Sequence, residues 1–109
     1  MDKGFDLWLV EIATGTRTKA ELKAHTGAYR RQSDLTQRLI FNALIEKQLF
    51  ETGDSVVVRV FLEDVPHRVF IINNALLSNG AELKAEPRFV LRGNLNYENS
   101  FVEVTIPQP

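Results

Sequence analysis

Residues 18 to 27 read Thr-Lys-Ala-Glu-Leu-Lys-Ala-His-Thr-Gly, and the folding of this stretch decides the architecture of the amino-terminal half of the chain. Thr18 is followed three residues later by Glu21, the spacing of a capping box in which the two residues satisfy the first free amides of a helix. Gly27 stands where a glycine commonly ends a helix. The stretch therefore predicts a helix of about two turns beginning at Lys19.

Two further helices are predicted, one on either side of this one. Residues 5 to 12 fit neither the helical nor the strand period cleanly, so a strand stays open as an alternative to a short helix. After Ser33 or Asp34, either of which can cap a helix, apolar residues recur at intervals of three and four. This longer helix is expected to run to about Leu49 and to stop before Gly53.

Beyond Gly53 the sequence is rich in β-branched and aromatic residues, which favour strands. Residues 56–62 and 68–72 are predicted to form an antiparallel pair around a loop of about five residues, and residues 89–92 and 101–106 a second pair. The expected fold class is α+β, in which three amino-terminal helices precede antiparallel strands.

Length and composition indicate one globular domain spanning residues 1–109. Apolar residues make up 44% of the chain, enough for one core that buries roughly two thirds of the surface of the unfolded chain. The chain has no cysteine, which excludes disulfides, thiolate nucleophiles and cysteine zinc sites. No apolar window approaches the ~18 residues of a membrane span, and Met1 to Ile12 lacks the pattern of a signal peptide, so a cytoplasmic location is expected.

Positive charge is concentrated between residues 17 and 38, although the whole chain carries a formal charge of −1. Six basic residues stand there against two acidic ones, and the remainder of the chain is acidic. A basic face of this kind attracts polyanions even when the total charge is near zero, whereas the alternative is a solvated helical surface without a partner. The basic residues are Arg17, Lys19, Lys23, Arg30, Arg31 and Arg38.

The order of the predicted elements resembles a winged helix-turn-helix domain over residues 5–62. Residues 6–13 are similar to the first helix of that superfamily, residues 18–27 to its second helix and turn, and residues 44–51 to the end of the third helix and the entry to the wing. The resemblance implies a three-helix winged-helix-like unit that docks its third helix in the major groove of duplex DNA, with residues 63–109 as a β-rich extension. Most such domains act as dimers, so a homodimer is one expected assembly.

The side chains expected to contact DNA are basic, or carry an amide or a hydroxyl group. Arginine binds phosphates or guanine edges, and glutamine and serine bond to bases. The expected contacts are Lys19, Lys23, Arg30, Arg31, Gln32, Ser33, Gln37 and Arg38. The resulting hypothesis is a small DNA-binding regulator or accessory protein that is not an enzyme and holds no cofactor. The alternative is a protein-binding inhibitor or adaptor, of the kind that phages and mobile elements encode, which does not bind DNA.

Other candidate sites are few. Glu63, Asp64 and His67 lie close together and could ligate a metal or serve a small hydrolase, but charged residues in a loop between strands are usually solvated, so no metal site is expected. No serine lies in a nucleophile elbow and the six glycines are scattered, so neither acyl transfer nor a phosphate-cradling loop is predicted. Tyr97 stands in a polar segment, where it is either an exposed anchor for a partner or folded back over its own hairpin.

Overall fold

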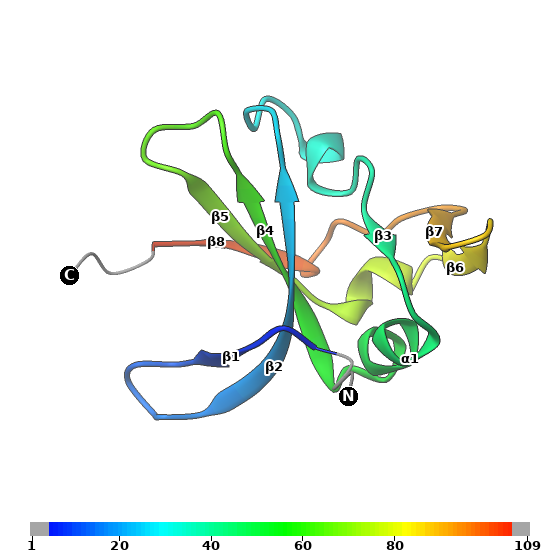
Figure 1. Ribbon diagram of the computed structural model, residues 1–109, viewed down its shortest axis with the longest axis horizontal. Helices are drawn as coiled ribbons and strands as arrows, with labels where there is room; N and C mark the ends of the chain where they lie inside the picture. Colours follow the sequence, from blue (N-terminus) through cyan, green and yellow to red (C-terminus); the bar gives the residue numbers. More distant parts are fainter. Residues whose placement is uncertain (1–4, 106–109) are drawn as a thin grey trace.

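The computed structural model describes residues 5–105, and its largest element is a mixed sheet of five strands (Figure 1). These strands are β1 (Leu7–Val10), β2 (Arg17–His25), β4 (Ser55–Phe61), β5 (Arg68–Ile72) and β8 (Phe101–Val104). They lie in the order β1-β2-β4-β5-β8 across the sheet. All neighbouring strands are antiparallel except β2 and β4, which run parallel.

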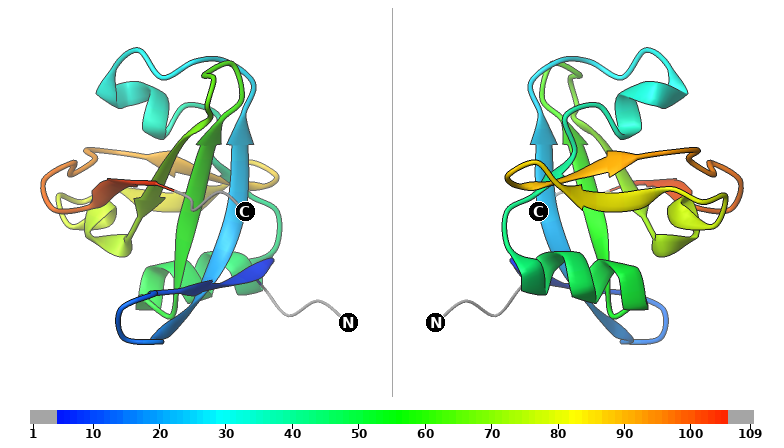
Figure 2. Two further views of the ribbon diagram at one scale, coloured as in Figure 1. Left: turned by 90° about the vertical axis from the view of Figure 1, so that its left-hand side faces the viewer. Right: turned by 90° about the vertical axis from the view of Figure 1, so that its right-hand side faces the viewer.

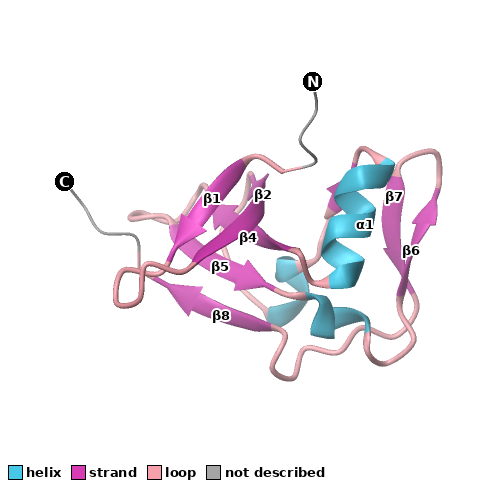
Figure 3. Cartoon of the chain, turned by 90° about the horizontal axis from the view of Figure 1, so that it is seen from below, coloured by secondary structure: helices cyan, strands magenta, loops and turns pink. Residues whose placement is uncertain are grey.

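The remaining elements lie together on one side of this sheet. They are the helix α1 (Leu44–Thr52), the 3-10 helices η1 (Gln32–Leu35) and η2 (Asn74–Leu77), and the strands β3 (Ile40–Phe41), β6 (Glu82–Ala85) and β7 (Phe89–Arg92). The last three strands form a small antiparallel sheet in the order β3-β7-β6. Figure 3 shows α1 between the large sheet and the hairpin of β6 and β7.

A long crossover joins the two parallel strands. The chain leaves β2 at His25, passes through η1, β3 and α1, and returns to the sheet at Ser55. A parallel connection needs a dozen or more residues, and this segment supplies them. Gly53 ends α1 in the left-handed conformation, with φ of 84°, and so turns the chain from the helix into β4. This confirms the predicted stop before Gly53.

The main hydrophobic core fills the space between the large sheet and the elements that cover it. Alternate residues of β4 and β5 point into this space, as the two-residue period of a strand requires. Phe61 and Phe70, from these two strands, meet edge to face with ring centroids 5.6 Å apart. The buried members of the core are Leu35, Leu39, Phe41, Phe50, Val57, Phe61, Phe70, Ile72, Leu76 and Leu83.

The expected α+β fold with a three-helix winged-helix-like unit over residues 5–62 is wrong. Residues 7–10 and 17–25 are strands, and α1 is the only α-helix within residues 5–105. The long helix expected after Ser33 is replaced by η1, β3 and then α1. Intrinsic helix preference amounts to only a few tenths of a kcal/mol per residue, so pairing of β2 with β4 outweighs the helix-forming Ala, Glu and Lys residues of β2.

The strands expected beyond Gly53 are confirmed in position but only partly in pairing. β4 and β5 form the expected antiparallel pair. β7 and β8 lie in the expected segments, but β7 pairs with β3 and β6 while β8 pairs with β5. Expecting these two strands to pair with each other was wrong, because neighbours in sequence need not be neighbours in a sheet. β6 was not predicted as a strand. Three of its four residues are exposed, so its side chains do not alternate regularly between buried and exposed positions.

Replacing Gly53 with alanine is expected to lower the free energy of unfolding by about 1 kcal/mol, because a residue with a side chain adopts this backbone conformation at about that cost. The added Cβ would also lie 3.3 Å from Nδ2 of Asn74. Urea denaturation measures the change, with Gln48→Ala at an exposed position of α1 as the control. An equal effect of both substitutions would contradict the special role of Gly53.

Candidate functional site

The large sheet has two faces of different character, and strand register assigns each residue to one of them. Paired residues on neighbouring strands share a face, and successive residues alternate between faces. We call the face that packs against α1 the inner face and the opposite one the outer face. Every outer-face position of the strands except Thr18 is apolar. These apolar residues are Leu7, Leu9, Ala20, Leu22, Ala24, Val56, Val58, Val60, Val69, Ile71, Val102 and Val104.

Within residues 5–105, the apolar cluster on the outer face is formed by strands of the large sheet alone. Its buried centre consists of Ala20, Val58 and Val69, and the side chains packed around them all belong to the same sheet. Away from the centre, Leu22 stays 46% exposed and Val102 55% exposed. The left view of Figure 2 looks onto this face, whereas α1 and the hairpin of β6 and β7 are in front only in the right view. The outer face is therefore buried at its centre by its own strands and exposed in the single chain at Leu22, Ala24 and Val102.

Apart from Thr18, β2 has its polar side chains on the inner face and its apolar side chains on the outer face. Glu21, on the inner face, is 5% exposed, while its neighbour Leu22 is largely open. An antiparallel or mixed sheet with one solvated face normally shows the opposite arrangement, with apolar residues inside. The apolar side chains that β2 places on the outer face are therefore suited to a sheet that is covered there.

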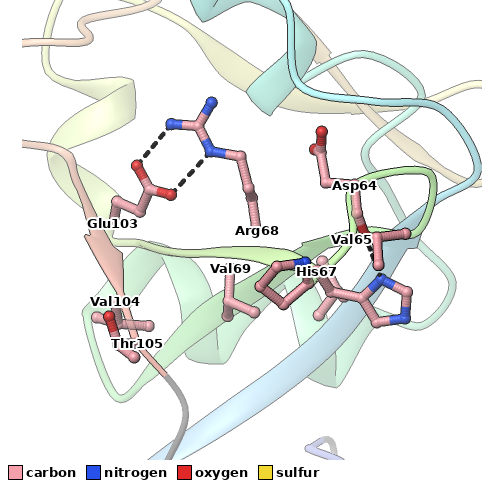
Figure 4. Close-up of a pocket in the computed structure, with 10 residues that line it drawn as sticks. Asp64, Val65, His67, Arg68, Val69, Glu103, Val104 and Thr105 are labelled. Atoms are coloured by element: carbon pink, nitrogen blue, oxygen red, sulfur yellow. Dashed lines mark hydrogen bonds and ion pairs between the residues drawn. The ribbon is translucent and has the colours of Figure 1, made fainter.

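An open hollow of about 930 Å³ lies at one end of the outer face (Figure 4). Val60, Val69 and Val104 line it from three adjacent strands. The loop between β4 and β5 closes one end with Pro66 and with Val65, which is 92% exposed. This hollow extends the apolar surface beyond the strands, with Asp64 and His67 among the polar residues at its border.

Arg68 and Glu103, which also line this hollow, form an ion pair between β5 and β8 (Figure 4). Nε and Nη2 of Arg68 donate to the two carboxylate oxygens at 2.8 and 2.7 Å. These bonds hold the pKa of Glu103 below its ordinary value. The guanidinium also lies over the ring of Tyr29, 4.6 Å from the centroid. Both residues belong to the inner face by register, so the strand positions of the outer face carry no charge, although the pair borders the hollow at its end.

A buried charge cluster lies between β2 and the beginning of α1. Nζ of Lys23 is 3.4 Å from Oε1 of Glu46 and 3.9 Å from Oε1 of Glu21. Burial, followed by the nearby carboxylates of Glu46 and Asp6, raises the pKa of Glu21 to about 8 although Lys23 acts in the opposite direction. Glu21 is therefore mostly protonated at neutral pH. Its Oε2 has no hydrogen-bond partner among the described residues.

Three exposed arginines lie in the loop between β2 and β3. None of Arg30, Arg31 and Arg38 forms an ion pair with another residue of the segment 5–105. Oδ2 of Asp34 accepts the backbone amides of Arg30 and Arg31 at 2.8 and 3.0 Å, and these bonds lower its pKa. Asp34 thus orders the backbone and leaves the guanidinium groups free. Arg30 and Arg31 also line an open hollow of about 550 Å³ together with His25.

A buried arginine connects this loop to the sheet. Arg59 on the inner face is 2% exposed, and its guanidinium donates to the main-chain carbonyl of Gln37. Burial lowers the pKa of Arg59 to about 10, so it stays charged at neutral pH. Nδ1 of His25 accepts the amide of Gly27 at 2.9 Å, and its Nε2 lies 3.3 Å from Oε1 of Gln37. The loop is therefore anchored from β2 and from β4.

The residues expected to contact DNA fall into two groups in the structure. Lys23 is held in the buried charge cluster, and Lys19 is half-buried with its Nζ 5.5 Å from the ring centroid of Phe5. The exposed group in the loop between β2 and β3 consists of Arg30, Arg31, Gln32, Ser33, Gln37 and Arg38. These side chains are carried by a loop and a 3-10 turn, so this fold has no recognition helix there to insert into the major groove.

Tyr97 lies against the periphery of the core. Its hydroxyl is 2.9 Å from Oγ1 of Thr36, and its ring packs edge-on against Phe101 with centroids 6.4 Å apart. Tyr97 is thus partly buried and packed against the core of its own chain. A contact of Tyr97 with a partner stays a prediction.

Glu63, Asp64 and His67 do not come together as a metal site. The Oδ2 of Asp64 accepts the amide of Tyr29 at 2.9 Å, and its main-chain oxygen lies 2.9 Å from Nδ1 of His67. Within residues 5–105 no group of three or more histidine, aspartate or glutamate side chains is placed to hold a metal. The bonds of Asp64 instead shape the loop between β4 and β5.

The outer face is missing from the sequence-based site prediction, although the sequence carries two signals for it. Residues 19–25 alternate between polar and apolar types, which is the period of a strand. Residues 56–61 and 68–72 are apolar at nearly every position, which is typical of strands covered on both faces. Together these patterns indicate a sheet whose second face also needs a cover.

The chain matches no protein-family model, no curated protein and no solved structure. Among the described residues, none of the helices has the length and apolar character needed to cross a membrane.

Glu21→Gln is expected to change how stability depends on pH. The raised pKa of Glu21 means that the unfolded chain loses this proton near pH 4.5 while the folded chain keeps it until about pH 8. Stability that the protonated group provides at low pH is therefore lost as the pH rises through this window, by up to about 1.4 kcal/mol per pH unit. Glutamine is uncharged throughout, so the variant is expected to gain stability relative to the wild type from about pH 5 to about pH 8.

Urea denaturation at several pH values checks this expectation. Glu82→Gln, which removes an exposed carboxylate from β6, is the control and should leave the pH dependence close to that of the wild type. If Glu21→Gln and the wild type show parallel curves, Glu21 is ionised in the folded protein and the assignment is wrong.

Proposed function

We propose that the protein acts by binding another protein through the outer face of its large sheet. The observation that carries this proposal is the inverted polarity of β2, which buries Glu21, covers most of the Lys23 side chain and leaves Leu22 about half exposed. Burying charged groups costs free energy, and so does exposing apolar ones. A partner on the outer face removes the second of these costs.

The composition of the central strands supports the same proposal. β4 and β5 have apolar residues on both faces, with Val58 and Val69 on the outer side opposite the core residues Val57 and Phe70. Soluble monomers rarely expose contiguous apolar patches of more than a few hundred Å², and larger patches mark interaction sites. The hollow beside Val65 continues this patch.

The apolar character of the outer face indicates what kind of partner surface can bind to it. No strand residue on this face carries a charge, so the matching surface is apolar and the complex is only weakly sensitive to salt. Leu22 and Val102 are each about half exposed, and covering either one contributes about 1 kcal/mol.

Photo-cross-linking in the cells that make the protein tests this proposal. A p-benzoylphenylalanine residue replaces Leu22 in one variant and Leu44 in another; both positions are exposed, but Leu44 lies on α1. Light-dependent protein adducts are expected for the variant at Leu22 and not for the variant at Leu44. Equal labelling at the two positions, or no adduct at Leu22, would contradict a covered outer face.

A second candidate function is binding of a nucleic acid backbone by the loop between β2 and β3. The observation that favours it is the absence of ion pairs at Arg30, Arg31 and Arg38 within residues 5–105, together with their exposure. Free guanidinium groups bind phosphates, and such contacts require no recognition helix. Binding of this kind recognises the charge of the phosphate backbone and not the base sequence.

Fluorescence anisotropy with labelled duplex DNA tests the second candidate between about 50 and about 200 mM salt. The double variant Arg30→Gln/Arg31→Gln is expected to weaken binding and to reduce the salt slope by about two. Arg88→Gln/Arg92→Gln removes the same charge from the hairpin of β6 and β7 and should bind like the wild type. Absence of binding at low salt, or the same loss in both double variants, would remove this candidate.

A further inference from the structure

We infer that the occupant of the outer face is a second copy of this chain, packed sheet against sheet around a two-fold axis. This inference rests on the proposed function and names the partner. It follows from the charge, the size and the twist of the outer face.

The absence of charge is the first reason. In a two-fold contact the residues close to the axis meet their own equivalents, so a charged residue there would meet a like charge. The strand residues of the outer face include no ionisable side chain, while the ion pair of Arg68 and Glu103 belongs to the inner face. The face is therefore free of the repulsion that opposes self-association.

The size of the face is the second reason. Five strands spaced about 4.8 Å apart span about 24 Å, and the seven residues of β4 extend about 23 Å, so the face covers on the order of 500 Å² before side-chain relief is counted. Ala20, Val58 and Val69 at the centre are already buried in the single chain, so two such faces together bury at most about 1,000 Å², which is the lower bound for a specific interface. A second copy therefore reaches this lower bound when it covers the whole face.

The shape of the sheet is the third reason. Two sheets pack well face to face when their twists match, with strand directions about 30° apart. Identical chains have identical twist, so a second copy satisfies this condition by symmetry. β4 is the middle strand of the five and lies on the axis in this arrangement, with Val58, which is already buried in the single chain, beneath the centre of the contact. Leu22 and Val102, on opposite sides of β4, become buried.

Sedimentation velocity between about 1 and about 200 µM measures the self-association directly. The wild type is expected to sediment with twice the mass of one chain, and the variants Leu22→Lys and Val102→Lys to dissociate at least 100-fold more readily. Both residues are about half exposed in the single chain, so the variants should keep the circular dichroism spectrum of the wild type. Leu44→Lys, at an equally exposed apolar position on α1, is the control and should remain dimeric.

A second measurement locates the contact. The chain has no cysteine, so Leu22→Cys carries a single spin label in each copy. One short distance between copies is expected for Leu22→Cys, and a distinctly longer one for Leu44→Cys on the far side of the sheet. Dilution with unlabelled chain should reduce the signal without changing either distance.

The outcomes separate this inference from the function on which it rests. A monomer at the highest concentration, or a dimer that survives both lysine variants, overturns the inference. If cross-links at Leu22 then join a different protein, the proposed function stands and only the identity of the partner is wrong. If the chain is monomeric and Leu22 gives no adduct, both proposals fall.

Discussion

The parallel pairing of β2 with β4 is the interaction on which the rest of the structure depends. It extends from Lys19 opposite Ser55 to His25 opposite Phe61 and fixes which side of β2 faces α1. The side that faces α1 is the polar one, so Glu21 and Lys23 are buried beside Glu46. The apolar side of the same strand is left on the outer face. One register thus decides both the buried charge cluster and the open apolar surface.

The two candidate surfaces differ in the kind of force they offer a partner. The outer face is apolar, and its attraction grows with the area removed from water and has no directional preference. The loop between β2 and β3 offers exposed guanidinium groups, whose attraction is directional and weakened by salt. The inner face supports the loop through Arg59, which bonds to Gln37. The sheet therefore contributes to both surfaces, one on each side.

Sequence-based expectation and structure diverge most in the amino-terminal half. Residues 18–27 satisfy the local rules for a capped helix and also alternate in polarity as a strand does. These local preferences do not decide between helix and strand. The strand is stabilised by pairing with β4, which lies thirty or more residues away in the chain. The exposed basic residues of the loop were identified correctly as surface groups, but Lys23 was not, because its partner Glu46 comes from another element.

By itself, the sequence determined the positions of β4, β5, β7 and β8 and the stop of α1 at Gly53, because β-branched runs and a glycine at a helix end act locally. It also determined that the arginines cluster in one segment, since that is a matter of spacing along the chain. Only the tertiary structure decided which strands pair, which side of β2 is buried and which apolar residues stay open. These depend on contacts between residues far apart in the chain, and a shift of one residue in register would reverse every side chain of a strand.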